Sequence, residues 1–261
     1  LPILSFRVEN LSFAYGTRTV LEGLNFALEA GRFYGLVGPN GRGKSTLLDL
    51  LAGHRRPAHG RILYRQQPIE SHGRRRLSRE LALVPQDFYI NFPFRVEEVV
   101  MMGRYPHLGR FARAGAADWQ RVDAAMARTG ITAFRGRLVS ELSGGERQRV
   151  VIARALAQDA AWLFLDEATS NLDVNHALAV LGQVRRSVRQ EGKTAVAVLQ
   201  DLHLAALFCD ELLLLKQGRL VTAGPTAGVL TAANIRRLFE GDARVARDPE
   251  SGSRHGVFRV A

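Results

Sequence analysis

Residues 38–46 form a glycine-rich run that reads Gly38-Pro39-Asn40-Gly41-Arg42-Gly43-Lys44-Ser45-Thr46. The run matches the pattern G-x-x-x-x-G-K-[ST], in which glycines let successive backbone N–H groups wrap around phosphate oxygens. Lys44 would add a positive charge at the outer phosphates, and the Ser45 hydroxyl could ligate the magnesium ion that accompanies them. The run predicts a nucleotide phosphate site, although many unrelated chemistries share this loop.

The chain on both sides of the loop has the order that this motif requires. Residues Arg32 to Val37 form a short, mostly apolar run that is typical of a buried strand. Residues Thr46 to Leu51 continue at helical spacing, so we expect a helix that begins near Lys44 and presents its positive end to the phosphates. An incidental Lys-Ser in a glycine-rich turn would lack this strand-loop-helix context.

Two adjacent carboxylates, Asp166 and Glu167, close a second apolar run, Trp162 to Leu165. Side chains alternate along a strand, so we expect the two carboxylates to point to different sides. One of them could then hold magnesium while the other faces an attacking water molecule. A solvated acidic strand end is the simpler alternative, but the phosphate loop in the same chain argues against it.

Four further motifs identify the family. They are the signature Leu142-Ser143-Gly144-Gly145-Glu146, the glutamine loop Val84-Pro85-Gln86-Asp87, the segment Ser170-Asn171-Leu172-Asp173, and Tyr15 within Phe13-Ala14-Tyr15-Gly16. The signature is the most specific, because Ser-Gly-Gly before a helix-like stretch, Glu146 to Leu156, offers a second set of phosphate-binding N–H groups. With these motifs, nearly the whole chain resembles the nucleotide-binding subunit of an ATP-binding cassette transporter.

The resemblance implies a role for each matching residue. ATP and Mg²⁺ are the expected ligands, with the adenine against Tyr15 and the phosphates on residues Gly38 to Thr46. Ser45, Gln86 and Asp166 would hold the metal, and Glu167 would act as general base beside the catalytic residues Gln86 and Gln200. Residues Leu142 to Glu146 would bind the ATP held by a second copy of the chain, and Asp173 would bridge to that copy, so a homodimer is expected.

Two positions depart from the family pattern. The family places a histidine at the terminal phosphate after the strand Thr194 to Leu199, whereas this chain has Gln200, and a one-residue shift cannot restore the motif because His203 lies three positions further on. A glutamine amide can donate a hydrogen bond but carries no positive charge, so some stabilisation of the transition state would be lost. The other departure is Arg42, at a loop position that usually holds a small residue, and we expect this side chain to project into solvent.

The 261 residues suit one cassette domain, residues 1–261, with an inserted helical subdomain at 87–158 that bears the signature. The predicted fold is α/β: a P-loop core with a mostly parallel sheet and an antiparallel β subdomain at the N-terminus. The segments that carry this prediction are the strands Phe6 to Glu9, Asn25 to Leu28, Thr194 to Leu199 and Leu212 to Lys216, and the helices Ala116 to Thr129 and Val174 to Glu191. No functional prediction is made for the charged stretch Asp242 to His255.

The composition favours a peripheral cytoplasmic subunit. No window of about 18 residues is free of charge, which argues against a membrane span. We also expect no signal peptide, because Leu1 to Leu4 lack a basic region, and no disulfide, because Cys209 is the single cysteine. The net charge is +11, with one tight cluster at Arg74 to Arg76. We interpret that cluster as a solvated face and expect no nucleic acid partner, while a contribution facing the membrane stays open.

The kind of transporter depends on weaker signals. Residues Ile90 to Gly109, and Gln200 to Ala206 apart from the glutamine, resemble the ATPases of importers for iron-siderophore complexes, haem and vitamin B12. Such subunits bind separate membrane permeases, and a substrate-binding protein indirectly, on the cytoplasmic face of the membrane. The aromatic residues after Gln86 would either grip the permease or form subdomain core; they are Phe88, Tyr89, Phe92 and Phe94.

Three alternatives remain. An exporter subunit is disfavoured because the sequence carries no fused membrane domain. A soluble cassette ATPase that acts on nucleic acid or ribosomes would be expected to have a second cassette or a coiled-coil insertion, and this sequence has one cassette and no heptads. A small-molecule kinase would share the phosphate loop but not the signature. The cargo itself is not encoded in any motif.

Overall fold

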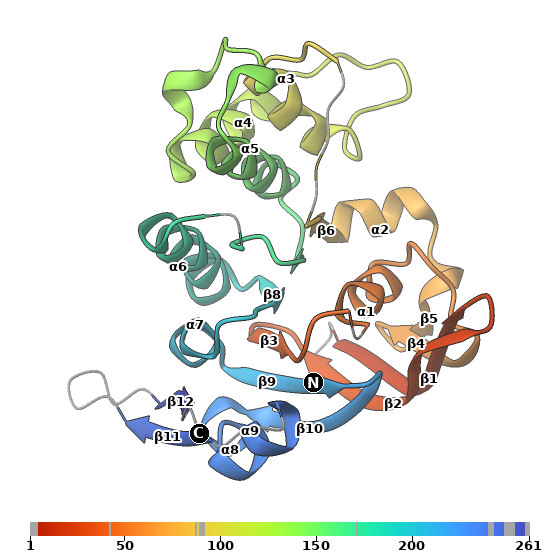
Figure 1. Cartoon of the computed structure of the whole chain (residues 1–261). Coiled ribbons are helices and arrows are strands. Elements are labelled where there is room, and N and C mark those ends of the chain that lie inside the picture. Colours follow the sequence, from red (N-terminus) through yellow and green to blue (C-terminus); the bar gives the residue numbers. More distant parts are fainter. Residues whose placement is uncertain are drawn as a thin grey trace. The chain divides into compact units, whose positions relative to one another are not determined.

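The computed structural model describes residues 5–41, 43–86, 88, 92–170, 172–239, 243–247 and 254–258. The chain divides into two compact units (Figure 1). The first unit combines Leu1–His72 with Thr194–Ala261, and the second unit is Gly73–Lys193. Each unit contains its own strands, helices and buried apolar side chains. The chain therefore leaves the first unit and returns to it once.

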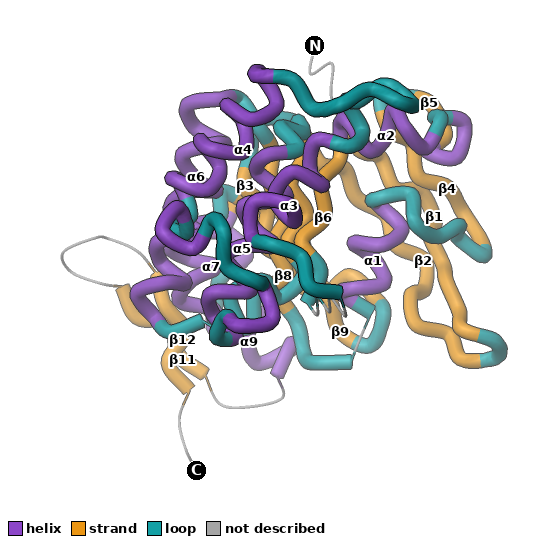
Figure 2. Tube along the Cα trace, turned by 90° about the horizontal axis from the view of Figure 1, so that it is seen from above, coloured by secondary structure: helices purple, strands orange, loops and turns teal. Residues whose placement is uncertain are grey.

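An antiparallel sheet opens the first unit, as the sequence predicts (Figure 2). Its strands, in the order β2-β1-β4-β5, are β2 (Arg18–Glu29), β1 (Ser5–Tyr15), β4 (His59–Tyr64) and β5 (Gln67–Pro68). The hairpin of β1 and β2 is longer than predicted, because pairing extends from Ser5 with Glu29 to Tyr15 with Arg18. Phe6 and Leu28 are buried partners on one face of this sheet.

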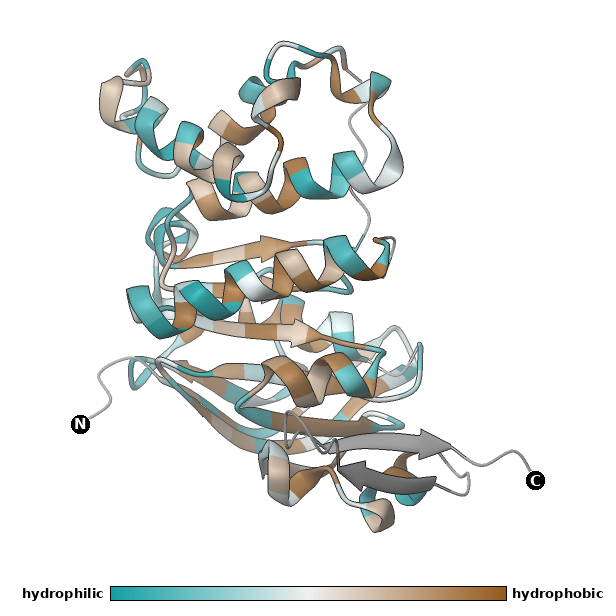
Figure 3. Cartoon of the chain, turned by 90° about the vertical axis from the view of Figure 1, so that its left-hand side faces the viewer, coloured by the Kyte–Doolittle hydropathy of each residue, from teal (hydrophilic) through white to brown (hydrophobic). Residues whose placement is uncertain are grey.

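Mostly parallel strands form the second sheet region of the first unit. In the order β10-β9-β3-β8 they are β10 (Arg219–Pro225), β9 (Glu211–Lys216), β3 (Phe33–Val37) and β8 (Thr194–Val198). β3 runs parallel to both β8 and β9, and all residues of β3 and β8 are buried. Such continuous apolar runs are typical of strands covered on both faces (Figure 3).

The remaining elements of the first unit are short. The helices are α1 (Lys44–Leu51), α7 (Leu202–Phe208), α8 (Thr226–Val229) and α9 (Ala232–Phe239), with the 3-10 turn η1 (Ile69–Ser71). Two strands, β11 (Ala243–Arg247) and β12 (Arg254–Phe258), pair antiparallel, and β12 begins within the stretch Asp242 to His255, for which the sequence made no functional prediction.

The second unit packs helices beside two parallel strands, β6 (Leu81–Val84) and β7 (Trp162–Leu165). Its helices are α2 (Arg74–Glu80), α3 (Val96–Met101), α4 (Ala116–Arg128), α5 (Gly144–Ala157) and α6 (Val174–Glu191), with the 3-10 turns η2 (Met102–Arg104), η3 (Thr132–Phe134) and η4 (Val139–Glu141). α3 and α4 both pack against α5 around buried valines such as Val99, Val122 and Val150.

The sequence prediction of the fold class is confirmed in its main features. The pairs β3–β8, β3–β9 and β6–β7 are parallel, whereas the pair β9–β10 is antiparallel. The inserted helical subdomain, predicted at 87–158, falls inside the second unit, and its separate identity stays a prediction. Within the described residues, no helix combines the length and hydrophobicity needed to cross a bilayer.

Candidate nucleotide-binding site

The phosphate loop joins β3 to α1 in the first unit, and two of its glycines are required by close contacts. A Cβ atom on Gly38 would lie 2.0 Å from the Leu215 carbonyl oxygen on the neighbouring strand. Gly43 has a φ of +94°, and a Cβ atom there would lie 2.6 Å from Leu21 Cδ2. Both positions therefore accept no side chain without movement of their neighbours. Arg42 lies outside the described residues, so its predicted projection into solvent stays a prediction.

Lys44 folds back over the loop that precedes it. Its Nζ donates to the carbonyl oxygens of Gly38, at 2.9 Å, and Pro39, at 3.0 Å. The residue is only 3% exposed, and a buried ammonium is costly unless it is well hydrogen-bonded. This arrangement holds the start of the loop in place. It also brings a positive charge to the N-terminal end of α1, where the first backbone N–H groups of the helix point outward.

Ser45 and Thr46 occupy the first turn of α1. Ser45 is exposed, while Thr46 is buried. The described residues contain no cluster of three or more histidine, cysteine, aspartate or glutamate side chains that could hold a metal ion by themselves. Mg²⁺ that accompanies a nucleotide usually takes one or two protein oxygens and completes its shell with phosphate and water. An exposed hydroxyl at this helix start is a suitable ligand.

Tyr15 lies beside the same helix and is 44% exposed. Its hydroxyl is 3.4 Å from Thr46 Oγ1, and the Phe13 ring meets it edge-on with centroids 5.0 Å apart. The guanidinium carbon of Arg55 lies 4.9 Å from the centre of the Tyr15 ring. The predicted adenine-binding ring is thus in contact with the phosphate loop helix. Arg55 was missed by the sequence analysis, since no motif marks a residue that approaches from outside the loop.

Gln200 follows β8, which lies directly beside β3. Leu36 pairs with Val198, and Leu199 N donates to Leu36 O at 3.2 Å. The carboxyl ends of parallel neighbours meet at one edge, so Gln200 and the phosphate loop leave the sheet at the same edge. Asp201 then caps α7, accepting from His203 N at 2.7 Å. The first unit therefore brings together Tyr15, the phosphate loop and Gln200.

The second unit brings together Gln86, Asp166 and Glu167. Val84 pairs with Leu165, and Asp166 N donates to Val84 O at 2.9 Å, so both strands end at this point. The predicted strand Trp162 to Leu165 is confirmed, but strand alternation does not extend to the carboxylates, and their pointing to different sides stays a prediction. Both carboxylates lie beyond the strand end, and Glu167 has a left-handed φ of +47°. A turn orients Glu167, and Ser170 N closes it by donating to Glu167 O at 3.0 Å.

The signature starts α5 with a reciprocal cap. Ser143 Oγ accepts from Glu146 N at 3.3 Å, and Ser143 N donates to Glu146 Oε2 at 2.7 Å. That backbone donor stabilises the carboxylate and lowers the pKa of Glu146. Gly144 and Gly145 follow in the first turn with no side chain to cover their N–H groups, and a Cβ on Gly144 would meet nothing within 4 Å. The helix predicted at Glu146 to Leu156 is confirmed, with bounds Gly144–Ala157.

Asp173 caps α6 in the second unit. It accepts from His176 N at 2.8 Å and lies 2.6 Å from His176 Nδ1. The donated backbone hydrogen bond, followed by the imidazole, lowers the pKa of Asp173. The sequence analysis missed His176, although its place three residues after a capping aspartate is a signal that could have found it. Asn171 lies outside the described residues.

The aromatic residues after Gln86 differ in exposure. Phe92 is 70% exposed, and its ring centroid is 6.2 Å from that of Phe94. Phe88 is half-buried, with the guanidinium carbon of Arg154 4.3 Å from its ring, and burial lowers the pKa of Arg154. Tyr89 lies outside the described residues. Phe92 is therefore a surface residue, and permease contact stays a prediction for all four.

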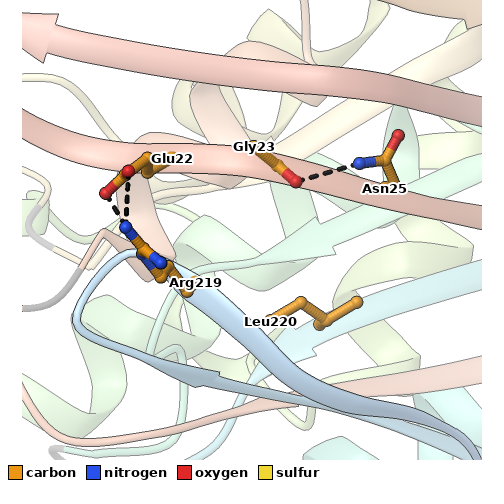
Figure 4. Close-up of a pocket in the computed structure, with 5 residues that line it drawn as sticks. All are labelled: Glu22, Gly23, Asn25, Arg219 and Leu220. Carbon is orange, nitrogen blue, oxygen red and sulfur yellow. Dashed lines mark hydrogen bonds and ion pairs between the residues drawn. The ribbon is translucent and has the colours of Figure 1, made fainter.

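A separate hollow of about 410 Å³ lies in the first unit between β2 and β10 (Figure 4). Arg219 closes it with two bonds to Glu22, at 3.1 and 2.5 Å, and Asn25 donates to Gly23 O at 2.9 Å. Its charges are already paired, and none of the predicted site residues line it. The hollow is therefore not the nucleotide site.

A glycine loop folded over by a buried lysine, between a buried parallel strand and a helix, defines a P-loop nucleotide-binding protein. Comparison with known proteins places the chain more narrowly: residues 21–170 match the profile of the ABC transporter family. The chain belongs to that family.

Named relatives agree with this assignment. The chain is 45% identical over 238 residues to a cobalamin import ATP-binding protein of Halobacterium salinarum, covering 91% of this chain and 59% of that protein. It is 40% identical to a hemin import ATP-binding protein of Rhodopseudomonas palustris, covering 94% of this chain and 91% of that one. A solved metal-chelate type ABC transporter in an inward-facing conformation superposes with a TM-score of 0.85 at 32% identity, covering 99% and 98% of the two chains.

Proposed function

We propose that the chain binds and hydrolyses ATP to power uptake of a metal chelate, such as an iron-siderophore, haem or vitamin B12, through a separate membrane permease. The observation that carries ATP binding is the buried Lys44 folded over its loop beside Tyr15, in a chain of this family. The cargo class is supported by the names of the cobalamin and hemin relatives and by the metal-chelate transporter. The subunit would act on the cytoplasmic face of the membrane.

Hydrolysis requires little covalent chemistry from the protein, because phosphoryl transfer is accelerated mainly by positioning and by charge neutralisation. Ser45, Gln86 and Asp166 would hold magnesium, which supplies positive charge beside the phosphate oxygens when it is bound. Glu167 would accept the proton of the attacking water, and Gln200 would donate to the terminal phosphate. The exposed amide of Gln86 and the half-buried carboxyl of Glu167 leave both groups accessible to solvent and ligand.

A second copy of the chain is the expected first partner. The capped start of α5 presents the backbone of Gly144 and Gly145 to a ligand, and neither glycine is fully buried. Beside Asp173, the apolar side chain of Val174 is 73% exposed, which suits a contact with another chain. In the homodimer, Ser143 of one copy would serve the nucleotide bound at Lys44 of the other. Permease subunits would complete the assembly, with a substrate-binding protein as an indirect partner.

Two substitutions test the ATPase proposal. Glu167→Gln should abolish turnover and leave ATP binding intact, because the amide cannot accept the water proton while the phosphate loop is unchanged. Lys44→Ala should weaken ATP binding itself, because it removes a charge-assisted contact. Steady-state hydrolysis and equilibrium ATP binding are measured for both variants. Near-normal turnover in Glu167→Gln would refute the general-base assignment.

A mixing experiment tests the shared site. Subunits with Ser143→Arg should be inactive alone, as should subunits with Lys44→Ala, but a mixed dimer contains one intact combination of Lys44 and Ser143. Activity should therefore reappear on mixing and rise with protein concentration. Full hydrolysis by a chain that stays monomeric in sedimentation would contradict the proposal.

Purification from a detergent extract tests the transport proposal. An importer subunit should co-purify with a polytopic permease, whose associated binding protein then identifies the cargo. Recovery with ribosomal RNA would instead support the soluble cassette ATPase. Recovery with an exporter permease would correct the direction of transport.

A further inference from the structure

A basic and aromatic surface lies on the second unit, apart from the residues assigned to ATP. It consists of α2 and the loop 105–115 that leads to α4. Together these segments carry six arginines and one acidic residue, Glu80; the arginines are Arg74, Arg75, Arg76, Arg79, Arg110 and Arg113. All six arginines are exposed. We call this the α2–105 surface.

Hydrogen bonds hold the loop against the helix, so the two segments form one surface. Arg75 Nε and Arg79 Nε both donate to Pro106 O, at 3.1 and 2.8 Å, and Arg75 Nη2 donates to Leu108 O. These acceptors are neutral carbonyl oxygens, so the bonds orient the guanidinium groups without cancelling their charge. Arg76 lies 3.4 Å from Glu80, which leaves the surface strongly positive.

Two aromatic side chains project from the same loop. Phe111 is 91% exposed, and Tyr105 is 58% exposed. The Arg110 guanidinium lies 5.6 Å from the Phe111 ring, so cation and ring occupy one place on the surface. An apolar ring this exposed gains free energy when a partner covers it.

We propose that the α2–105 surface binds the headgroup layer of an anionic membrane. The arginines would meet lipid phosphates, and the rings of Phe111 and Tyr105 would enter the interface, where aromatic side chains are favoured. A bilayer offers a dense layer of phosphates above apolar chains, which matches exposed arginines on both sides of an exposed phenylalanine. The inference rests on the proposed function only in one respect, that the protein works beside a membrane. The contact itself needs no permease and no nucleotide.

The test is sedimentation of the full chain with vesicles, in the absence of permease. Vesicles of phosphatidylcholine containing one-third phosphatidylglycerol should bind the protein, whereas pure phosphatidylcholine should not. Each arginine near an anionic surface is worth about fivefold in binding, so Arg74→Gln, Arg110→Gln and Arg113→Gln together should weaken it about a hundredfold. Phe111→Ser should weaken it about tenfold, through lost apolar contact. High salt should also release the protein.

A matched control removes the same charge elsewhere: Arg56→Gln, Arg186→Gln and Arg237→Gln, at three other exposed positions. This variant should bind vesicles nearly as the parent does, and both triple variants should keep the parent ATPase rate and melting temperature. Equal loss in both triple variants would show that net charge alone drives binding, and would overturn the proposal. Unchanged vesicle binding by the α2–105 triple variant would also overturn the proposal. The same holds if that variant binds vesicles like the parent and loses only binding of a single-stranded RNA. Because ATPase activity is measured separately, failure here leaves the proposed function intact.

Discussion

Replacing Gln200 by histidine should raise the ATPase rate about tenfold, which corresponds to about 1.4 kcal/mol of barrier. The backbone at this position is fixed from both sides, because Leu199 N bonds to Leu36 O on β3 and Asp201 caps α7. The substitution therefore changes the donor and leaves its place intact. Outright loss of a preorganised donor to developing charge costs about 2.7–4 kcal/mol, but glutamine keeps one N–H donor, so a partial gain is expected.

The assay is steady-state hydrolysis by the parent, Gln200→His and Gln200→Ala, with ATP affinity measured in parallel. Affinity should change far less than turnover, because Lys44 and Tyr15 are expected to supply most of the ground-state binding. The gain from histidine should grow as the pH falls toward about 6.5, where an unperturbed imidazole becomes protonated. Equal turnover in all three proteins would refute the reasoning. In that case His203 or Arg42 would already supply the contact, and His203→Gln and Arg42→Ala would identify which.

Two further predictions concern stability. Gly38→Ala places a Cβ 2.0 Å from Leu215 O and should destabilise the chain by about 1–3 kcal/mol, seen as a lower melting temperature. Gly182→Ala on α6 has open space around it and should stabilise the chain by about 1 kcal/mol. Similar melting temperatures of the two variants would contradict the close contact at Gly38. The backbone N–H of Gly115 donates to the Asp118 carboxylate and lowers the pKa of Asp118 in the folded chain. The hydrogen bond therefore contributes fully to the free energy of unfolding above the unfolded pKa of about 3.9, and this contribution is lost as the pH falls through the lower folded pKa. Asp118→Asn should remove that part of the acid dependence in melting curves between pH 6 and strong acid, and an unchanged acid limb would disprove it.

Local signals decided most of the fold at the sequence level. The helix at Val174 to Glu191 was predicted with its observed bounds, because a capping aspartate precedes its apolar period and Gly192, with a φ of +67°, ends it. The antiparallel hairpin was predicted too short, because register shifts between Val8 and Ala14 interrupt the alternating pattern along β1. The short strand β5 and the edge strand β10 carry too few apolar residues to produce an alternating pattern.

The site shows the same division between local and distant information. The phosphate loop could be predicted from the spacing of its residues alone, because its glycines and its lysine lie within one short segment. Arg55 beside Tyr15 joins residues 40 positions apart, and Arg79 at Pro106 joins residues 27 positions apart, which no local pattern encodes. The turn at Glu167 was also beyond the sequence argument, because a left-handed backbone at a glutamate is uncommon and interrupts the alternation assumed for a strand.

The residues proposed to bind ATP and those proposed to hydrolyse it lie in different kinds of local structure. The phosphate loop is held by the buried Lys44, and the backbone at Gly38 leaves no space for a side chain beside Leu215. The groups proposed for hydrolysis lie on turns and beyond strand ends: Glu167 sits on a turn, Gln86 is exposed, and Gln200 would supply a donor without charge. A loop with so little free space tolerates little change, whereas groups on turns can vary while affinity is kept. Gln200, at the position where the family has a histidine, therefore lies where a substitution should alter the hydrolysis rate more than ATP binding. For this reason Gln200→His should change turnover while leaving ATP affinity nearly unchanged.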